Sequence, residues 1–311
     1  MSLAAAGAVL FAWALDALLA EPPARLHPVA RFGRLVAPFD REWARPRLVG
    51  GCVAAALPLL AAGAAWGAVR AASALDPLAG ALLAALALFS ATSRRMLVDV
   101  AREVVAASAT DLPRARRELR ALAGRDSTTL SAEQVRSAAV ESAAENLADG
   151  LVAPLLAFVA GSLVGGPALG AGAAAWVKAV NTLDSMLGYR SKRVGTASAR
   201  LDDAVMWLPA RASALLLALS ARSPAALAAA RPWLPGVPSP NSGWPMGTLA
   251  AATGARLEKP GVYALNPDAP LPSRAAAERG IRVADRAARL AFAVSALALA
   301  LPALPGVIGW S

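Results

Sequence analysis

The sequence predicts an all-α, polytopic membrane protein, and two observations lead to this prediction. Hydrophobic residues make up 57% of the 311 residues and charged residues only 17%, with a mean hydropathy of +0.50. The apolar residues are also segregated, because runs of 22, 26 and 21 residues carry no charge, at 48–69, 151–176 and 290–310. Each run can cross about 30 Å of hydrocarbon as a helix, whereas a transmembrane barrel would show short alternating segments. We therefore expect one integral membrane domain over residues 1–311.

Composition excludes several other classes of protein. Cys52 is the only cysteine and lies inside an apolar run, so neither a disulfide nor a cysteine metal site is expected. The single histidine, His27, excludes multi-histidine zinc or iron sites. The net charge is +10, but the basic residues are spread among loops without interleaved aromatic residues, so we expect no nucleic-acid partner.

The expected spans follow from the apolar runs, and their orientation follows from the loops. Spans are expected at 3–20, 48–69, 77–93 and 290–310. No Lys or Arg precedes the first run, as the start of a cleaved secretory signal would require. Lys and Arg number six in 21–47, nine in 94–150, five in 177–203 and nine in 222–289. Because positive residues favour the cytoplasmic side, these four loops are expected to be cytoplasmic.

Three segments are less regular. Residues 151–176 contain GSLVGGP, whose Gly-Gly-Pro breaks a helix near the middle of the run. A re-entrant pair of half-helices would return the chain to the cytoplasm, and we favour it over a simple span. Residues 204–221 are interrupted by Pro209 and Arg211, which predicts an interfacial or re-entrant segment. Residues 231–272 are rich in Pro and Gly and predict an ordered loop rather than a helix.

The stretch VESAAENLADG carries the densest group of acidic residues. Glu141, Glu145 and Asp149 are four apart, so on an α-helix all three lie along one face. A solvated helix face would explain them, but this helix runs directly into an apolar segment, where carboxylates are rare and usually functional. Binding Mg²⁺, which takes a few carboxylates together with water and phosphate oxygens, would remove their repulsion.

Two further polar stretches follow the long apolar run. In NTLDSMLGYR, Asn181 and Asp184 are one helical turn apart, and Lys178 lies one turn earlier. An ordinary membrane anchor uses Lys, Arg, Trp and Tyr, so Asn and Asp indicate a functional site. In ARLDDAVMWLPAR, the adjacent Asp202 and Asp203 diverge by about 100° on a helix and can serve different partners. A helix amino terminus, where acids complement the dipole, explains them equally well.

Three shorter stretches have mainly local interpretations. GRDSTTLSAEQV predicts a turn followed by a helix capped by Ser131 with Gln134, and Arg125 with Asp126 and the hydroxyls could hold a phosphate. His27 precedes a proline, which favours a structural turn over a catalyst. SPNSGW reads as a plain turn.

Taken together, these stretches resemble the adenosylcobinamide-phosphate synthase family of cobalamin biosynthesis, the CobD/CbiB membrane proteins. The matching stretches run in order from Asp16 to about residue 263: EPPARLHPVARFGR, GRDSTTL, VESAAENLADGLVAP, KAVNTLDSMLGYR, ARLDD with PAR, SPNSGWP and LEKPGVY. The ordered combination of ESAAEN-x-x-DG with NTLDSM-x-GY is the most specific part. Two positions depart from the family pattern, because Met206 replaces an Asn and 236–238 lacks a His.

The resemblance implies an amide-forming ligase. Adenosylcobyric acid, a corrinoid, would be joined to (R)-1-amino-2-propanol phosphate, with ATP activating the corrinoid carboxylate as an acyl phosphate. In this reading Mg²⁺ is held by Glu141, Glu145, Asp149 and Asp184, with Glu145 and Asp184 also acting in catalysis, and Asp202 or Asp203 deprotonates the amine. The cations Arg125, Lys178, Arg190 and Arg200 would bind phosphate oxygens. The amides of Asn146, Asn181 and Asn241 would read the corrinoid, and further substrate-binding candidates are His27, Asp126 and Arg211.

The partners expected are the two substrates and the lipid bilayer of the inner cell membrane, with the active site facing the cytoplasm. Contacts with other late cobalamin-pathway membrane enzymes and homo-oligomerisation are left open. The polar stretches are expected to converge on a single inner-leaflet pocket. One alternative is a Mg²⁺-dependent membrane prenyltransferase, which also places Asn- and Asp-rich helix ends over a cavity. Another is a non-catalytic sensor or transporter.

Overall fold

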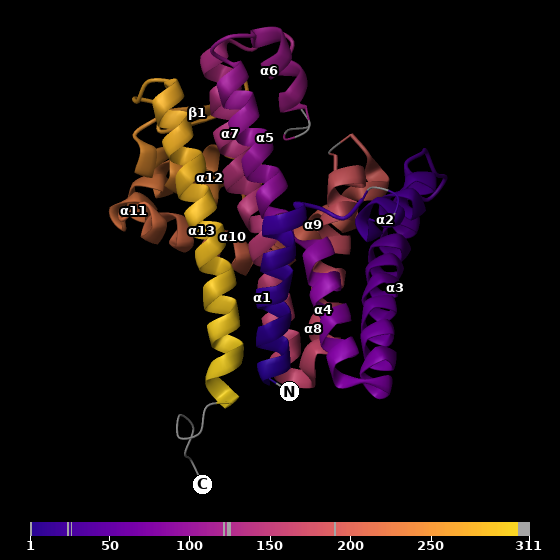
Figure 1. Ribbon diagram of the computed structural model, residues 1–311. Coiled ribbons are helices and arrows are strands. Elements are labelled where there is room, and N and C mark those ends of the chain that lie inside the picture. The colour runs from indigo at the N-terminus through magenta and orange to yellow at the C-terminus, as the bar shows by residue number, and fades with distance from the viewer. Residues whose placement is uncertain are drawn as a thin grey trace. The chain divides into compact units, whose positions relative to one another are not determined.

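The structure is a computed structural model that describes residues 2–23, 25, 27–120, 122, 126–189 and 191–303. It confirms an all-α fold, with one short β-hairpin in the described part of the chain (Figure 1). The chain forms two compact units. Unit 1 comprises Met1–Ser93, Ala153–Val205 and Ala291–Ser311, and unit 2 comprises Arg94–Val152 and Met206–Leu290.

Unit 1 contains the long apolar helices. Its elements are α1 (Ser2–Leu19), α2 (Pro28–Val36), η1 (Ala37–Phe39), α3 (Pro46–Leu75), α4 (Pro77–Ala91), α8 (Ala153–Leu187), η3 (Arg193–Gly195), α9 (Thr196–Val205) and η5 (Leu301–Ala303). Prolines start α2, α3 and α4 at the first helical turn, where no backbone N–H is needed. Asp76 caps α4 by accepting a hydrogen bond of 2.8 Å from Ala79 N.

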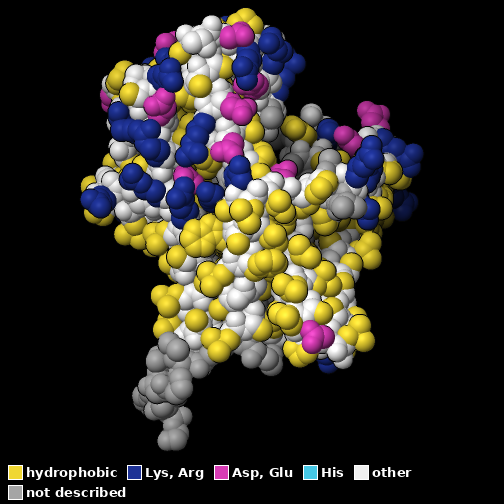
Figure 2. Space-filling view, viewed as in Figure 1, with side chains coloured by type: hydrophobic (Ala, Val, Ile, Leu, Met, Phe, Trp, Pro, Cys, Tyr) yellow, Lys and Arg dark blue, Asp and Glu magenta, His cyan; other side chains and the backbone are white. Residues whose placement is uncertain are grey.

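The surface of unit 1 is suited to lipid. Leu59, Leu78 and Val164 expose 63%, 67% and 83% of their surface, and Figure 2 shows hydrophobic side chains covering much of the visible face of α1 and α4. So much exposed apolar surface is unfavourable in water. The core holds α3 against α8 through small residues, since a Cβ at Gly172 would lie 3.1 Å from both Ala62 O and Trp66 Cβ.

Three helical stretches of the described chain are long and apolar enough to cross a membrane, Pro46–Leu75, Pro77–Ala107 and Ala132–Leu187. A fourth is added if Arg193–Val205 and Trp207–Ser220 form one broken span. These lengths support a multi-pass membrane protein. The span expected at 290–310 is not among them, because its apolar residues continue α13 (Arg274–Ala300), whose first half is charged. Residues 304–310 of that prediction lie outside the described residues.

Helix α8 is interrupted at the predicted Gly-Gly-Pro break. Gly165 and Gly166 have non-helical backbone angles, and Gly166 has a φ of 74° that favours glycine. A Cβ at Gly161 would lie 2.7 Å from Leu169 O, and one at Gly170 would lie 2.7 Å from Phe158 O. In a straight helix those pairs would be about 12 and 18 Å apart. The arms 153–164 and 167–187 therefore fold back on each other as a hairpin, the shape that a re-entrant segment requires.

Unit 2 contains the shorter, more polar elements. They are α5 (Arg94–Ala107), α6 (Leu112–Leu119), α7 (Ala132–Leu147), η2 (Ala148–Val152), α10 (Trp207–Ser220), α11 (Ala225–Ala230), η4 (Arg231–Gly236), α12 (Gly243–Thr253), β1 (Leu257–Lys259), β2 (Tyr263–Leu265) and most of α13. Strands β1 and β2 are antiparallel, with Leu257 opposite Leu265. Lys, Arg, Asp and Glu side chains gather over α5 and α6 (Figure 2).

Two local predictions have different outcomes in unit 2. The capping box at the start of α7 is confirmed, because Ser131 Oγ accepts from Gln134 N at 3.2 Å and Ser131 N donates to Gln134 Oε1 at 2.9 Å. The prediction of a loop without a helix over 231–272 is wrong, since α12 and the β-hairpin both lie in it. Pro245 falls in the first turn of α12, where proline is compatible with a helix.

Candidate functional site

The candidate acids of unit 1 lie on α8 and α9, which pack together. Asp184, near the end of α8, is close enough to Asp203 of α9 for their charges to repel. A side chain at position 188 would clash next to this pair, because a Cβ at Gly188 would lie 2.7 Å from Asp184 O. Asp202 and Asp203 are both half-buried, whereas Arg200 is exposed. The packing of α8 against α9 is thus compatible with the prediction that Asp184, Asp202 and Asp203 belong to one site.

The other described polar candidates of unit 1 lie on two elements. His27 is at the start of α2, and Lys178 and Asn181 are on the second arm of α8. His27 caps α2, because its Nδ1 accepts from Val29 N at 3.3 Å. Burial lowers the pKa of His27 below its ordinary value, partly opposed by Glu21 and assisted by the positive charge of Lys178. Lys178 is therefore near His27. Asn181 is half-buried, and its carbonyl accepts from Ser185 Oγ at 2.8 Å. Arg190 lies outside the described residues.

In unit 2 the acidic helix departs from its predicted geometry. Glu141 and Glu145 lie on α7, but Asp149 lies in η2, a π-helical turn. Asp149 therefore follows the α-helix instead of lying in it, and the predicted spacing of four along one α-helix applies only to Glu141 and Glu145. Among the described residues, no three His, Cys, Asp or Glu side chains are grouped closely enough to hold a metal ion. Glu141, Glu145 and Asp149 therefore do not form such a group.

Glu141 has protein partners that the sequence did not predict. It is fully buried, and its carboxylate accepts from Tyr263 OH at 2.9 Å and from Ser137 Oγ at 3.1 Å. Ser137 Oγ also accepts from Glu258 N at 2.8 Å, which ties the β-hairpin to α7. Buried charge requires such hydrogen bonds. The only sequence signal for Tyr263 was its position in the LEKPGVY stretch.

Arg211 and Asn241, 30 positions apart in the sequence, meet in unit 2. Arg211 Nη1 donates to Asn241 Oδ1 at 3.1 Å and to Trp207 O at 2.7 Å. The guanidinium carbon lies 4.3 Å from the ring centre of Trp207 and 5.3 Å from that of Trp244. Asn241 is buried, Arg211 half-buried and Trp207 exposed. The PAR and SPNSGWP stretches therefore form one cluster around the planar, positively charged guanidinium of Arg211. Such a cluster is suited to an anionic or amide-bearing ligand.

The remaining candidates of unit 2 have local roles. Asp126 accepts from Thr128 N at 2.9 Å and Thr128 Oγ1 at 2.8 Å, and these bonds hold the pKa of Asp126 below its usual value. Ser127 is buried and donates to Arg116 O at 2.7 Å. Asn146 donates to Ser142 O at 3.0 Å. Arg125 lies outside the described residues. Met206, one of the two departures from the family pattern, is buried.

A buried charge cluster was also missed by the sequence reasoning. Asp285 of α13 is buried and lies within 3.5 Å of nitrogen atoms of Arg94, Arg102 and Arg289. Only the pair Asp285–Arg289, at the helical spacing of four, leaves a signal in the sequence. The two partners on α5 are brought in by packing.

These features define a helical integral membrane protein whose acid, amide and arginine side chains cluster at the ends of its helices. A family model described as "CobD/Cbib protein" matches residues 9–291. The chain therefore belongs to the CobD/CbiB family, which also favours the resemblance over the prenyltransferase alternative.

The chain is similar over most of its length to curated members of that family. It is 36% identical over 307 residues to the probable cobalamin biosynthesis protein CobD of Methanothrix thermoacetophila, covering 94% of this chain and 96% of the relative. It is 41% identical over 273 residues to the cobalamin biosynthesis protein CobD of Geobacter metallireducens, 83% of each. The cobalamin biosynthesis protein CbiB of Salmonella typhi is 35% identical over 308 residues, 93% of this chain and 94% of the relative. No solved structure matches the chain. Membership of this family supports a role in cobalamin biosynthesis.

Proposed function

We propose that the protein is an adenosylcobinamide-phosphate synthase, which joins adenosylcobyric acid to (R)-1-amino-2-propanol phosphate through an amide bond. The observation that carries the proposal is the family match over residues 9–291, which includes the acidic stretches of both units. The relatives are named as cobalamin biosynthesis proteins, and their names do not state the reaction.

The proposed reaction has two steps. A corrinoid carboxylate oxygen attacks the γ-phosphorus of ATP, the bond to the β–γ bridging oxygen breaks, and an acyl phosphate and ADP form. The amine nitrogen then attacks the acyl carbon, the carbon–oxygen bond to phosphate breaks, and inorganic phosphate leaves. The proton released from nitrogen passes to a carboxylate, for which Asp202 is our candidate because Asp203 is assigned to the ion below. Activation is needed because direct condensation of a carboxylate with an amine in water is unfavourable.

The acid pair of unit 1 fits a Mg²⁺ ion better than the acidic helix of unit 2 does. Mg²⁺ usually takes one or two carboxylates and completes its shell with water and substrate phosphates, which Asp184 and Asp203 can satisfy. The half-burial of Asp184 close to the carboxylate of Asp203 is the observation that favours a cation there. Glu141 already accepts hydrogen bonds from two hydroxyls, which assigns it a structural role. When bound, the ion would neutralise phosphoryl oxygens.

The Arg211 cluster is our candidate for substrate recognition. Arg211 Nη1 donates hydrogen bonds to Asn241 and Trp207, and these bonds together with the two nearby indole rings restrain the orientation of the guanidinium. A guanidinium held in this way binds a phosphate or carboxylate with little loss of side-chain entropy. Asn241, held by the same hydrogen bond, can read a corrinoid amide. Arg200 is exposed and is a further candidate for the phosphate groups.

One assay tests the proposal. Purified full-length protein in detergent, given adenosylcobyric acid, aminopropanol phosphate and Mg-ATP, should produce adenosylcobinamide phosphate and hydrolysed ATP. The Asp202→Asn variant should lose about 10²–10⁴-fold in turnover if this residue is the base, whereas the exposed Asp268→Asn serves as the matched control. Product formed without ATP would overturn the activation step, and isoprenoid transfer would favour a prenyltransferase. An Asp184→Asn variant with full Mg²⁺-dependent turnover would overturn the assignment of the ion to the acid pair.

We also propose that the polar stretches of both units face the cytoplasm. The test uses single cysteines introduced at the exposed Ser185 and Thr129 in a Cys52→Ser background. A membrane-impermeant maleimide should label both only in inside-out vesicles. Labelling of the two positions from opposite sides would refute this orientation.

A further inference from the structure

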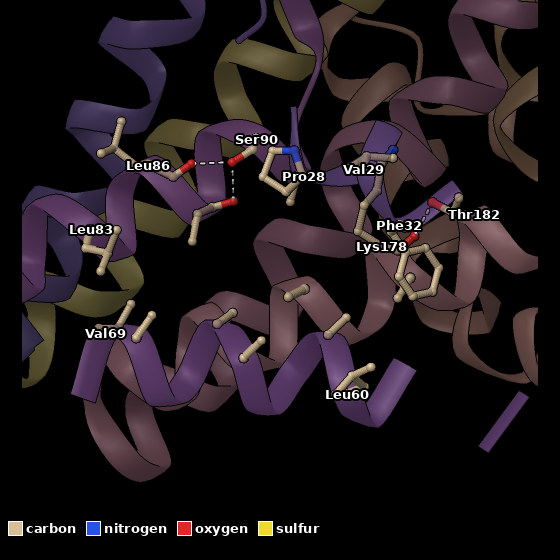
Figure 3. A pocket seen from close by; sticks show the side chains of 18 of the residues that line it. Pro28, Val29, Phe32, Leu60, Val69, Leu83, Leu86, Ser90, Lys178 and Thr182 are labelled. Atoms are coloured by element: carbon tan, nitrogen blue, oxygen red, sulfur yellow. Dashed lines mark hydrogen bonds between the residues drawn. The ribbon is translucent and has the colours of Figure 1, made fainter. Parts of the chain in front are cut away.

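Unit 1 contains a cavity of about 550 Å³ walled by α2, α3, α4 and α8 (Figure 3). This volume lies within the range of about 300–1,000 Å³ typical of small-molecule sites. One wall is the second half of α3, from Leu60 to Val69, and α4 adds Leu83 and Leu86. Phe32 of α2 also lines it. Most of the wall is hydrophobic, so the cavity suits a hydrocarbon chain.

The polar side chains of the cavity are few. Lys178 is the only charged one among the described residues that line it. The hydroxyls of Ser90 and Thr182 donate to backbone carbonyls of their own helices, at 2.6 Å to Leu86 O and 2.7 Å to Lys178 O. Figure 3 shows Lys178 and Thr182 close together beside Phe32. The cavity therefore pairs one cationic group with an extended apolar wall, as an amphiphile with an anionic head requires.

The surroundings favour a membrane lipid as the source of that amphiphile. Leu60 and Leu86 expose 59% and 46% of their surface, so the cavity wall continues into the apolar surface of the membrane helices. Helix α2, which lines the cavity, has no acidic residue and carries the exposed Arg31 and Arg34. Basic residues next to membrane helices attract anionic lipids. A small soluble anion would not use the apolar wall.

We propose that this cavity binds an acyl chain of an anionic phospholipid, with the phosphate of its headgroup at Lys178. Asp184 and Asp203 are not among the residues that line the cavity. It gives Lys178 a different ligand from the substrate phosphates that the sequence suggests. The inference does not depend on the proposed synthase reaction, because lipid binding is measured without turnover.

The test uses the full-length protein reconstituted into phosphatidylcholine vesicles. A small fraction of phosphatidylglycerol with a photoactivatable diazirine in its acyl chain is the probe, and cross-linked peptides are mapped by mass spectrometry. We expect labelling within 60–69 and 83–91, with unlabelled phosphatidylglycerol competing about fivefold better than phosphatidylcholine. Lys178→Gln should abolish that preference, and Lys178→Arg should keep it because the charge is retained.

Two matched variants, in each of which phenylalanine replaces an alanine of α3, test the apolar wall. Ala64→Phe fills the cavity and should prevent labelling, whereas Ala56→Phe, exposed on α3 but outside the cavity wall, should not. Size-exclusion elution of each variant as a single peak verifies its fold. Equal competition by the two lipids would overturn the proposal, as would unchanged labelling of both Lys178→Gln and Ala64→Phe. Loss of labelling on addition of inorganic phosphate or aminopropanol phosphate would assign Lys178 to a soluble phosphate instead.

Discussion

Replacing Tyr263 with Phe tests the buried hydrogen bond that joins the β-hairpin to α7. The substitution removes only the hydroxyl that donates to Glu141 Oε2 at 2.9 Å, and the acceptor carboxylate is fully buried. A hydrogen bond to a charged group contributes about 1.5–3 kcal/mol. At about 2–4 °C per kcal/mol for a domain of 150–250 residues, the loss corresponds to a fall in Tm of about 3–12 °C. Thermal unfolding of the purified protein in detergent, followed by tryptophan fluorescence, measures it.

The chain supplies its own control for this experiment, because it has only two tyrosines. Tyr189 is exposed, and its ring, 4.9 Å from Lys192 Nζ, is retained in Tyr189→Phe. Tyr189→Phe should therefore leave Tm within about 1 °C, since surface substitutions usually change stability by less than about 0.5 kcal/mol. If Tyr263→Phe melts with the wild type, or if both variants fall equally, the bond does not stabilise the fold and Glu141 is again open as a metal ligand.

Three further predictions concern the hairpin formed by the two arms of α8, the cap of α2 and the Arg211 cluster. Gly170→Ala should destabilise the folded protein by about 1–3 kcal/mol, because the added Cβ would lie 2.7 Å from a carbonyl oxygen of the other α8 arm. Gly63→Ala is the control, because its Cβ meets nothing within 4 Å and the change should raise Tm. Since burial lowers the folded-state pKa of His27 from 6.5, the unfolded state binds more protons as pH falls below 6.5, and stability is lost there. His27→Asn keeps a capping side chain and should flatten this part of the Tm-versus-pH curve. Arg211→Lys should raise the KM of one substrate about 2- to 30-fold, equivalent to about 0.5–2 kcal/mol, whereas the exposed Arg231→Lys should not.

The sequence predicts well what is decided by near neighbours in the chain. The Ser131–Gln134 cap depends on two residues three apart, and the break in α8 depends on adjacent residues, Gly165 and Gly166. The contacts of Glu141 could not be predicted in the same way, because Tyr263 is 122 positions away. The expectation of one acidic face, drawn from the spacing of four, assumed a regular α-helix. Nothing in the sequence marked the π-helical turn.

The electrostatic argument for a divalent ion changes once these contacts are known. From the sequence, three like charges on one helix face needed a cation to offset their repulsion. In the structure, two hydroxyl donors contact the carboxylate of Glu141, and Asp149 lies beyond the end of the α-helix. The two carboxylates that the packing of α8 against α9 brings near each other are those of Asp184 and Asp203. Partial burial of a carboxylate near a second one destabilises its charged form. A bound cation would offset that destabilisation, so Mg²⁺ should raise the Tm of the wild-type protein and leave that of Asp184→Asn unchanged.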